Sequence, residues 1–324
     1  MLPIIESLQS EALVTLGGVG DAAALEAWRI AYLGSNGKVK AILAGLKDVP
    51  KDQKPAIGAR RSQLAWLVIG EGSNLIVSDS GFDGIVFRFR EASISVDSGR
   101  LVAGAGAILQ DLVDFSVHHG LAGLHTMTGI PGSVGAAVYG NAGAYGHSLH
   151  EFVECVRFFD GTGIRQFSNA ECGFAYRESL FKRNKRWIIL AATLVLPAGD
   201  PAELGAKARE IRAIRDAKYP PSMRCAGSIF KNVLAHQLPP AVLAIVPPSL
   251  IRDGKIPSAW FLEQVGAKGI RQGDIQVAAY HANLIYNDGI GQAADLVAVI
   301  AGLKARVAER FGFFLEEEVQ YVGF

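Results

Sequence analysis

Apolar residues recur at helical spacing at the beginning of the chain. In Ala22–Leu33 they repeat at roughly three- and four-residue intervals, which predicts a helix that ends at the break Gly34–Gly37. The same pattern predicts a helix over Lys38–Leu46, followed by the helix breaker Pro50, and a third over Ala56–Leu64. Residues 1–65 are therefore expected to form a helical arm.

Short apolar runs separated by turn residues replace this pattern from Ala65 to about Pro197, and they predict a β-rich region. The expected strands are Trp66–Ile69, Leu75–Val77, one within 81–90, Ser93–Val96, Leu101–Ala103, Val153–Phe159 and Trp187–Val195. A helix over Ile108–His119 interrupts them.

The last third of the chain mixes both patterns. A charged helix is expected over Asp200–Lys218 and mixed segments after Cys225. A final helix over Ala293–Phe311 places its apolar residues on one face, and a terminal strand is expected over Phe314–Val319. The predicted fold class is α+β, with a helical arm (1–65), one domain over 66–200 and a second over 201–324.

Composition excludes several classes of protein. Half of the 324 residues are hydrophobic and 19% are charged, which is enough to build a core and rules out a disordered chain. The net charge of +1 gives no electrostatic attraction towards nucleic acid or anionic membrane. Three cysteines without CxxC spacing predict neither a disulfide framework nor a metal site. No signal peptide or membrane span is expected, so a cytoplasmic protein is predicted.

Three glycine-rich loops are the first candidates for ligand binding. Gly70–Asn74 follows a predicted strand, but Leu75 occupies the third glycine position of GxGxxG and no helix follows, so a Rossmann fold is not predicted. Its backbone N–H groups still suit an anion such as pyrophosphate. Loops 129–137 and 141–146 are similarly rich in small residues. Each loop alone is explained by a tight turn, whereas three within about eighty residues favour a ligand lying against backbone.

Six sequence blocks, in one order, carry a resemblance to a known family. They are GEGSNLIVSDSGFDG (70–84), GLHTMTGIPGSVGAAVYGNAGAYG (123–146), FAYRESLFK (174–182), AGSIFKN (226–232), AYHANLIYN (279–287) and LEEEVQYVG (315–323). Over about residues 66–324 the chain resembles the UDP-N-acetylenolpyruvoylglucosamine reductase family, in its short subtype. The resemblance implies an FAD-binding domain of the PCMH/VAO-like type over 66–200 and a substrate domain over 201–324.

The first 65 residues do not fit this family, whose usual first lobe of the FAD-binding domain is expected to be missing. Residues 25–64 instead resemble the N-terminal arm of the phenylalanine–tRNA ligase α chain. That arm contacts tRNA, but here it has eight Lys and Arg against six Asp and Glu within residues 1–65, so nucleic-acid binding is not favoured.

The resemblance implies NADPH-dependent reduction of UDP-N-acetylenolpyruvoylglucosamine to UDP-N-acetylmuramate with non-covalent FAD. It makes Ser228 the proton donor, and Arg177 and Glu318 the pair that polarises the substrate carboxylate and stabilises the enolate. In a strand, Glu316 and Glu318 face the same way and Glu317 the other, so alternation cannot choose between the first two. The matching block selects Glu318.

The same resemblance assigns the binding residues. Those for the flavin are Gly70, Gly72, Ser73, Asn74, Leu75, Gly129, Ile130, Gly132, Ser133, Gly135, Asn141, Gly143 and Tyr145. Those for the substrate are Tyr176, Lys218, Asn232 and His281. His281 has an equally weighted alternative as a core histidine, and the sequence leaves the oligomeric state open.

Two rival hypotheses follow from the replaced first lobe. The chain is either the reductase, or an inactive fusion remnant in which lost contacts impair FAD binding, or a helical tRNA-binding or assembly module built on residues 22–64.

Overall fold

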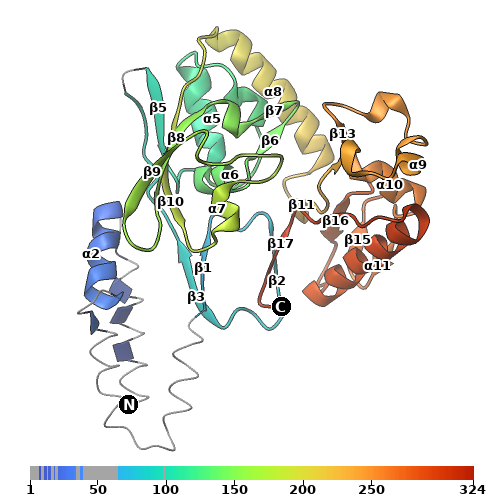
Figure 1. The fold of residues 1–324 in the computed structure, drawn as a ribbon, viewed down its shortest axis with the longest axis horizontal. Helices are drawn as coiled ribbons and strands as arrows, with labels where there is room; N and C mark the ends of the chain where they lie inside the picture. Colours follow the sequence, from blue (N-terminus) through green and yellow to red (C-terminus); the bar gives the residue numbers. More distant parts are fainter. Residues whose placement is uncertain are drawn as a thin grey trace, which may run out of the picture.

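A helix near the N-terminus, a central body and a C-terminal body follow one another along the chain (Figure 1). The computed structural model describes residues 7–8, 11–12, 14–15, 18, 21–33, 37–38, 65–97 and 99–324. The predicted helices over Lys38–Leu46 and Ala56–Leu64 lie outside the described residues, apart from Lys38 itself.

A five-stranded antiparallel sheet forms the centre of the first body, in the order β4-β5-β10-β8-β9. Its strands are β4 (Ile94–Asp97), β5 (Arg100–Gly104), β8 (Val153–Phe159), β9 (Ile164–Ser168) and β10 (Ile188–Leu194). The central strand β10 is almost continuously apolar because it lies between two neighbours and beneath a helix, and five of its seven residues are buried.

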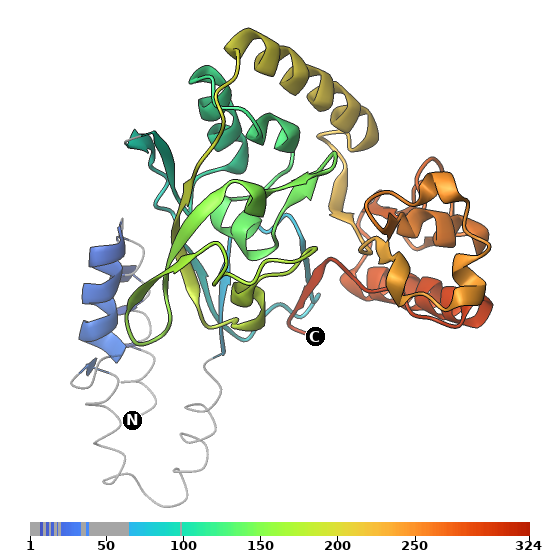
Figure 2. The ribbon, with the colours of Figure 1, turned by 45° about the horizontal axis from the view of Figure 1, so that its top comes forward.

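Helices stack in layers on this sheet (Figure 2). Helix α6 (Val134–Tyr139) lies directly on β10 and β5, and α5 (Leu109–His118) packs on α6 and on the 3₁₀ helix η2 (Leu124–Met127). The long helix α8 (Pro201–Lys218) covers α5 and η2. It begins at Asp200, whose carboxylate accepts a hydrogen bond from the N–H of Glu203, with Pro201 in the first turn.

The C-terminal body packs a second antiparallel sheet against helix α11 (Ala293–Phe311). The sheet order is β11-β16-β15-β14, with strands β11 (Arg224–Ser228), β14 (Arg271–Gln272), β15 (Ile275–Val277) and β16 (Leu284–Asn287). Helix α11 buries Val299, Ile300, Leu303, Val307 and Phe311 and ends at Gly312, whose φ of +74° is the left-handed conformation that glycine adopts without strain.

Shorter elements complete the two bodies. In the first they are β6 (Gly143–Ala144), β7 (His147–Ser148), η3 (Leu149–Glu151) and α7 (Leu180–Arg183). In the second they are β12 (Val233–Leu234), η4 (Ala235–Gln237), α9 (Pro240–Leu243), η5 (Pro248–Leu250), β13 (Lys255–Ile256) and α10 (Ser258–Gln264).

Two pairs of parallel strands join distant parts of the chain. Strand β1 (Ala65–Ile69) pairs with β3 (Gly84–Arg88), and β2 (Leu75–Val77) pairs with β17 (Gln320–Val322). The second pair ties the end of the chain to the segment after the first glycine loop, and Ile76 of β2 lies in the hydrophobic core of the C-terminal body.

The α+β class is confirmed, and so are most predicted elements. The predictions for Val153–Phe159 and Ala293–Phe311 match β8 and α11 to the residue. A short strand, β2, follows Gly70–Asn74, as the absence of a Rossmann helix requires. The terminal strand predicted over Phe314–Val319 is wrong, because the strand is Gln320–Val322 and Glu317 forms an isolated bridge with Phe230.

Helix α2 (Ala22–Leu33) packs against the β1–β3 pair through aromatic side chains. The ring of Trp28 lies edge-on to Phe87 of β3 at 6.4 Å between centroids, and Trp66 of β1 lies edge-on to the same ring at 6.1 Å. A two-stranded sheet has little stability by itself. The arm therefore covers part of the sheet that begins the FAD-side body.

Substituting Trp28→Ala removes this contact, and we expect it to lower the free energy of unfolding by about 1–2 kcal/mol, a value typical of a half-buried aromatic pair. Urea unfolding followed by circular dichroism measures the loss. The control is Ile30→Ala on the same helix, where the side chain is 54% exposed. Equal losses in the two variants would show that the arm does not support the sheet.

Candidate active site

The segment that carries the three glutamates pairs with the segment that follows Ser228. The backbone N–H of Glu318 donates to the carbonyl of Ile229 at 2.7 Å, and the N–H of Lys231 donates to the carbonyl of Glu316 at 2.9 Å. Because Ile229 follows Ser228 directly, this pairing brings the backbones of two predicted catalytic residues, 90 positions apart in sequence, next to each other.

Arg177 joins Glu318 through an ion pair. Its Nε donates to Glu318 Oε1 at 2.8 Å, and the two side chains are 21% and 25% exposed. Its Nη2 also donates to the carbonyl of Gly143 at 2.8 Å, in one of the predicted flavin loops. A charge-assisted bond between partly buried groups is stronger than a solvent-exposed one. The guanidinium is therefore fixed in one place.

The backbone of Arg177 is held in a conformation that non-glycine residues rarely adopt, with φ of +56°. Lys182 Nζ donates to the carbonyl of Arg177 at 2.8 Å. The buried side chain of Asn141 donates to the carbonyl of Ala175 at 2.8 Å. Surroundings that fix both sides of a strained residue are typical of sites where position matters.

A second ion-pair network lies beside the first and is centred on Lys231. Its ammonium contacts Glu178 at 3.1 Å and Glu316 at 2.9 Å, and its side chain is 8% exposed. Burial alone lowers the pKa of a lysine, but the bonds to these carboxylates outweigh it and raise the pKa of Lys231. Lys182 also contacts Glu178 at 3.1 Å. The network thus joins the Arg177 loop to the glutamate segment.

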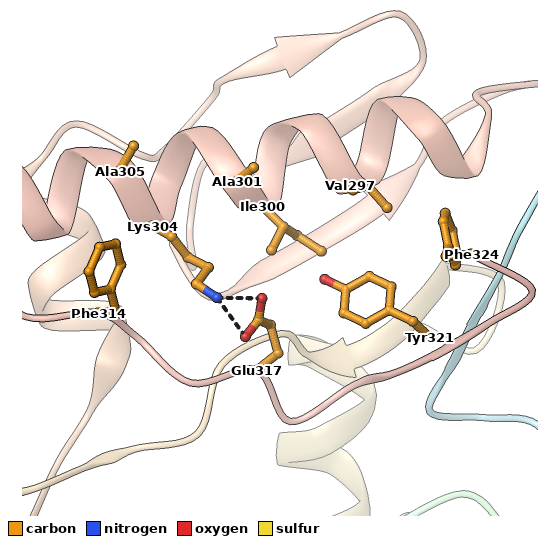
Figure 3. A pocket seen from close by; sticks show the side chains of 9 residues that line it. All are labelled: Val297, Ile300, Ala301, Lys304, Ala305, Phe314, Glu317, Tyr321 and Phe324. Atoms are coloured by element: carbon orange, nitrogen blue, oxygen red, sulfur yellow. Dashed lines mark hydrogen bonds and ion pairs between the residues drawn. The ribbon is translucent and has the colours of Figure 1, made fainter.

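The three glutamates alternate as predicted. Glu316 and Glu318 reach the cations of the site, whereas Glu317 pairs with Lys304 of α11 at 2.8 Å. Figure 3 shows this pair in a pocket of about 520 Å³ between α11 and the C-terminal segment. The pocket is lined mainly by apolar side chains and by none of the predicted site residues, so it is not the catalytic centre.

A β-bulge sets the position of Ser228. Cys225 pairs with Tyr286 and Ser228 with Leu284, so β11 has one residue more than β16 across this interval. Gly227 takes up the extra residue with φ of +82°. Bulges commonly redirect a side chain next to an active site. The Ser228 hydroxyl lies 3.0 Å from the hydroxyl of Tyr219, the residue that follows α8.

The predicted substrate residues fall into two pairs. The hydroxyl of Tyr176 accepts a hydrogen bond from the N–H of Asn232 at 3.0 Å. Lys218 lies at the end of α8, close enough to His281 to act with burial in lowering the pKa of this histidine to about 4. Nδ1 of His281 accepts from the N–H of Asn283 at 3.2 Å. His281 is therefore neutral near pH 7 and keeps its other ring nitrogen as a donor.

The first two flavin loops touch each other and the catalytic segment. Ser73 Oγ donates to the carbonyl of Pro131 at 3.4 Å, and a Cβ on Gly70 would meet Ser133 Oγ at 2.6 Å. Asn74 Nδ2 donates to the carbonyl of Glu318 at 3.0 Å. The loop predicted to hold the flavin is thus bonded directly to the residue predicted to stabilise the enolate.

The loops have the properties that an anionic cofactor requires. Gly72 has φ of +75° and open space where its Cβ would be, so its backbone is accessible to a ligand. Arg215 Nε is buried without a hydrogen-bond partner, and a Cβ on Gly129 would lie 3.2 Å from it. A buried unpaired donor costs about 1–3 kcal/mol, so an acceptor is expected here. A diphosphate supplies such acceptors, and the residues present fit FAD.

The remaining predicted flavin residues lie in the same loops but differ in what they contact. Gly132 has φ of +117° beside Ser73, and Leu75 begins β2. The remaining positions serve structure: Ile130 packs on the core, Gly135 lets α6 approach Ala105, the Asn141 amide is bonded internally, and Tyr145 is an exposed residue of the β6–β7 turn.

Family models match three parts of the chain. They are the UDP-N-acetylenolpyruvoylglucosamine reductase C-terminal domain over residues 219–322, an FAD binding domain over 57–167, and the aminoacyl tRNA synthetase class II N-terminal domain over 20–64. UDP-N-acetylenolpyruvoylglucosamine reductase of Solibacter usitatus is 61% identical over 82% of this chain and 85% of its own length. The chain belongs to this reductase family.

More distant relatives agree. The reductase of Heliobacterium modesticaldum is 36% identical over 86% of this chain and 85% of its own. The crystal structure of UDP-N-acetylenolpyruvylglucosamine reductase (MurB) from Thermus caldophilus matches with a TM-score of 0.63 and 29% identity, over 81% of this chain and 87% of that one. The model match over 20–64 confirms the resemblance of the arm to a tRNA ligase domain.

Sequence reasoning missed four residues that hold the site. Arg215, Tyr219 and Lys231 stand beside predicted residues in sequence, yet their partners lie in other elements. Asn283 is the fourth: its buried amide bonds to both the N–H and the carbonyl of Phe230, at 2.9 and 2.8 Å. Lys231 and Asn283 belong to the matching blocks AGSIFKN and AYHANLIYN, and this membership was the available signal.

Two further searches cover the described residues. No helix among them is long and apolar enough to cross a membrane. Across the same part of the chain, no group of three or more histidine, cysteine, aspartate or glutamate side chains is placed to hold a metal ion.

Substituting Lys231→Met leaves Glu178 and Glu316 without their cation, and we expect it to lower the free energy of unfolding by about 2 kcal/mol. It should also slow turnover, because the Arg177 loop loses its tie to the glutamate segment. Lys304→Met is the matched control, since it removes the cation of Glu317 on the opposite side. If both variants lose stability but turn over equally, the Lys231 network does not position the site.

Proposed function

We propose that this chain is an NADPH-dependent flavoenzyme that reduces UDP-N-acetylenolpyruvoylglucosamine to UDP-N-acetylmuramate, a step of peptidoglycan precursor synthesis. The observation that carries the proposal is the Arg177–Glu318 ion pair, fixed between the Asn74 loop and the strand that leads from Ser228. The names of the relatives and the matched FAD binding domain support the substrate and the cofactor. The NADP specificity and the site assignments are our proposals.

FAD, when bound, supplies the hydride that the enolpyruvyl double bond accepts. The loops around Gly72 and Gly129, with Arg215, would hold it. What remains for the protein is to stabilise the negative charge that develops on the substrate and to provide one proton. Both tasks require groups whose positions are fixed before the reaction.

Arg177 is suited to the first task. Its guanidinium stays charged at any physiological pH, and its fork matches a carboxylate. Because the bonds to Glu318 and Gly143 fix the fork, it pays little reorganisation when charge grows on the substrate oxygens. Glu318 orients the guanidinium through Nε, and with it polarises the substrate carboxylate.

Ser228 is assigned the second task, as the donor of the proton to the substrate carbon. The side chains of Tyr176 and Asn232 stand near Arg177 and those of Lys218 and His281 near the end of α8, and we assign these four to the diphosphate and nucleotide end of the substrate. Lys218 supplies positive charge, and neutral His281 supplies a hydrogen-bond donor.

The rival hypotheses make different predictions. An inactive remnant takes up no FAD, and a tRNA-binding module binds tRNA in a strongly salt-dependent manner. A cytoplasmic location stays a prediction. The complete Ser228, Arg177 and Glu318 set favours the reductase.

Substituting Ser228→Ala separates the two half-reactions. We expect NADPH to bleach the flavin absorbance at the parental rate, because Ser228 takes no part in that step. Recovery of the absorbance on adding the enolpyruvyl substrate should slow by about 10²-fold or more, since the proton donor is absent. Stopped-flow absorbance measures both.

The control is Ser222→Ala, an exposed serine shortly before β11, which should leave both steps unchanged. Loss of both steps together in Ser228→Ala would contradict the assigned role and indicate a damaged flavin site instead.

A further inference from the structure

The hydroxyl of Ser228 is hydrogen-bonded to a phenol that neither the sequence motifs nor the proposed mechanism uses. Tyr219 Oη and Ser228 Oγ are 3.0 Å apart, and either is able to act as the donor. Tyr219 caps the C-terminal end of α8, where its N–H donates to the carbonyl of Arg215 at 2.6 Å. An eighteen-residue helix therefore fixes the phenol beside the serine.

Two cations lie over the ring of Tyr219. Lys218 Nζ is 5.1 Å from the ring centroid and the guanidinium carbon of Arg215 is 5.6 Å from it, both within the range of cation–π contacts. These contacts hold the ring in place. They also put positive charge near the phenol oxygen, where it stabilises a negative charge if one forms.

This arrangement answers a chemical difficulty of the proposed reaction. An alcohol is a very weak acid, so a serine that gives its proton to carbon leaves an unfavourable alkoxide unless a neighbour restores the proton at once. A phenol is a stronger acid than an alcohol, and here it is already in hydrogen-bond contact with the serine oxygen. The alkoxide therefore need not build up.

We propose that Tyr219 is a positioning residue that acts through Ser228, donating its hydrogen bond to Oγ and passing its proton to Oγ as the serine proton moves to the substrate. The inference rests on the function proposed above. The O–H bond of Ser228 breaks as the C–H bond of the product forms, and the O–H bond of Tyr219 breaks as a new O–H bond forms on Ser228.

The charge balances without a further reactant. The electron pair of the substrate enolate becomes the new C–H bond, and the negative charge ends on the phenol oxygen beside Lys218 and Arg215. Water then returns a proton to Tyr219. Nothing is oxidised or reduced in this proton transfer.

Tyr219→Phe tests the proposal, because it removes one oxygen and keeps the ring between its cations. In the full-length FAD-loaded protein, bleaching by NADPH should stay within about twofold of the parent. Recovery on adding the enolpyruvyl substrate should slow by about 10- to 100-fold. Tyr280→Phe is the matched control, since its hydroxyl, on a side chain 54% exposed, donates to the carbonyl of Lys218 at the same helix end.

Mixtures of light and heavy water distinguish a relay from mere support. Two protons move together in the parent, so its recovery rate should depend on the deuterium fraction along a curve, whereas Tyr219→Phe should give a straight line. Parental recovery in Tyr219→Phe, or the same dependence in both proteins, overturns the relay. A parent protein that binds FAD but shows no recovery with this substrate overturns the proposed function, and the relay with it.

Discussion

The pairing of residues 316–320 with three separate parts of the chain is the constraint on which the site depends. On one side the backbone of this segment bonds to Ile229 and Lys231, next to Ser228. On the other side Asn74 donates to the carbonyl of Glu318 and accepts from the N–H of Gln320, which begins the β2–β17 pair. The side chain of Glu318 then fixes Arg177. One extended segment thus sets the relative positions of the flavin loop, the proposed proton donor and the cation.

The charges around this segment stabilise its geometry more than the fold as a whole. Partly buried ions lose much of their hydration, so a single ion pair adds little to the free energy of unfolding. Here Lys231 shares two carboxylates, and Glu178 shares two lysines, so each buried charge has a partner on a different segment. Such a network penalises any displacement of the Arg177 loop from the glutamate segment. The strained backbone of Arg177 is tolerated because its neighbours are held on both sides.

Local patterns predicted the elements of this protein better than its contacts. Periodicity was sufficient for β8 and α11, because each buries a face that its own sequence defines. The terminal strand was misplaced because pairing with β2 and with Phe230, not local alternation, decides where the strand lies. Alternation still separated Glu317 from Glu316 and Glu318 correctly. Tyr219 and Lys231 escaped notice because their roles arise from partners 9 to 85 positions away, and no local pattern encodes such a meeting.

Uptake of FAD by the purified full-length protein tests the central claim most directly, because the arm stands where the family has its first lobe. Visible absorbance is recorded before and after adding FAD and removing the excess, and again after adding NADPH. The account predicts a protein-bound flavin band that NADPH bleaches, since the loops around Gly72 and Gly129 and the unpaired Arg215 donor fit the cofactor. A protein that stays colourless after FAD is added would contradict it and would favour the inactive remnant.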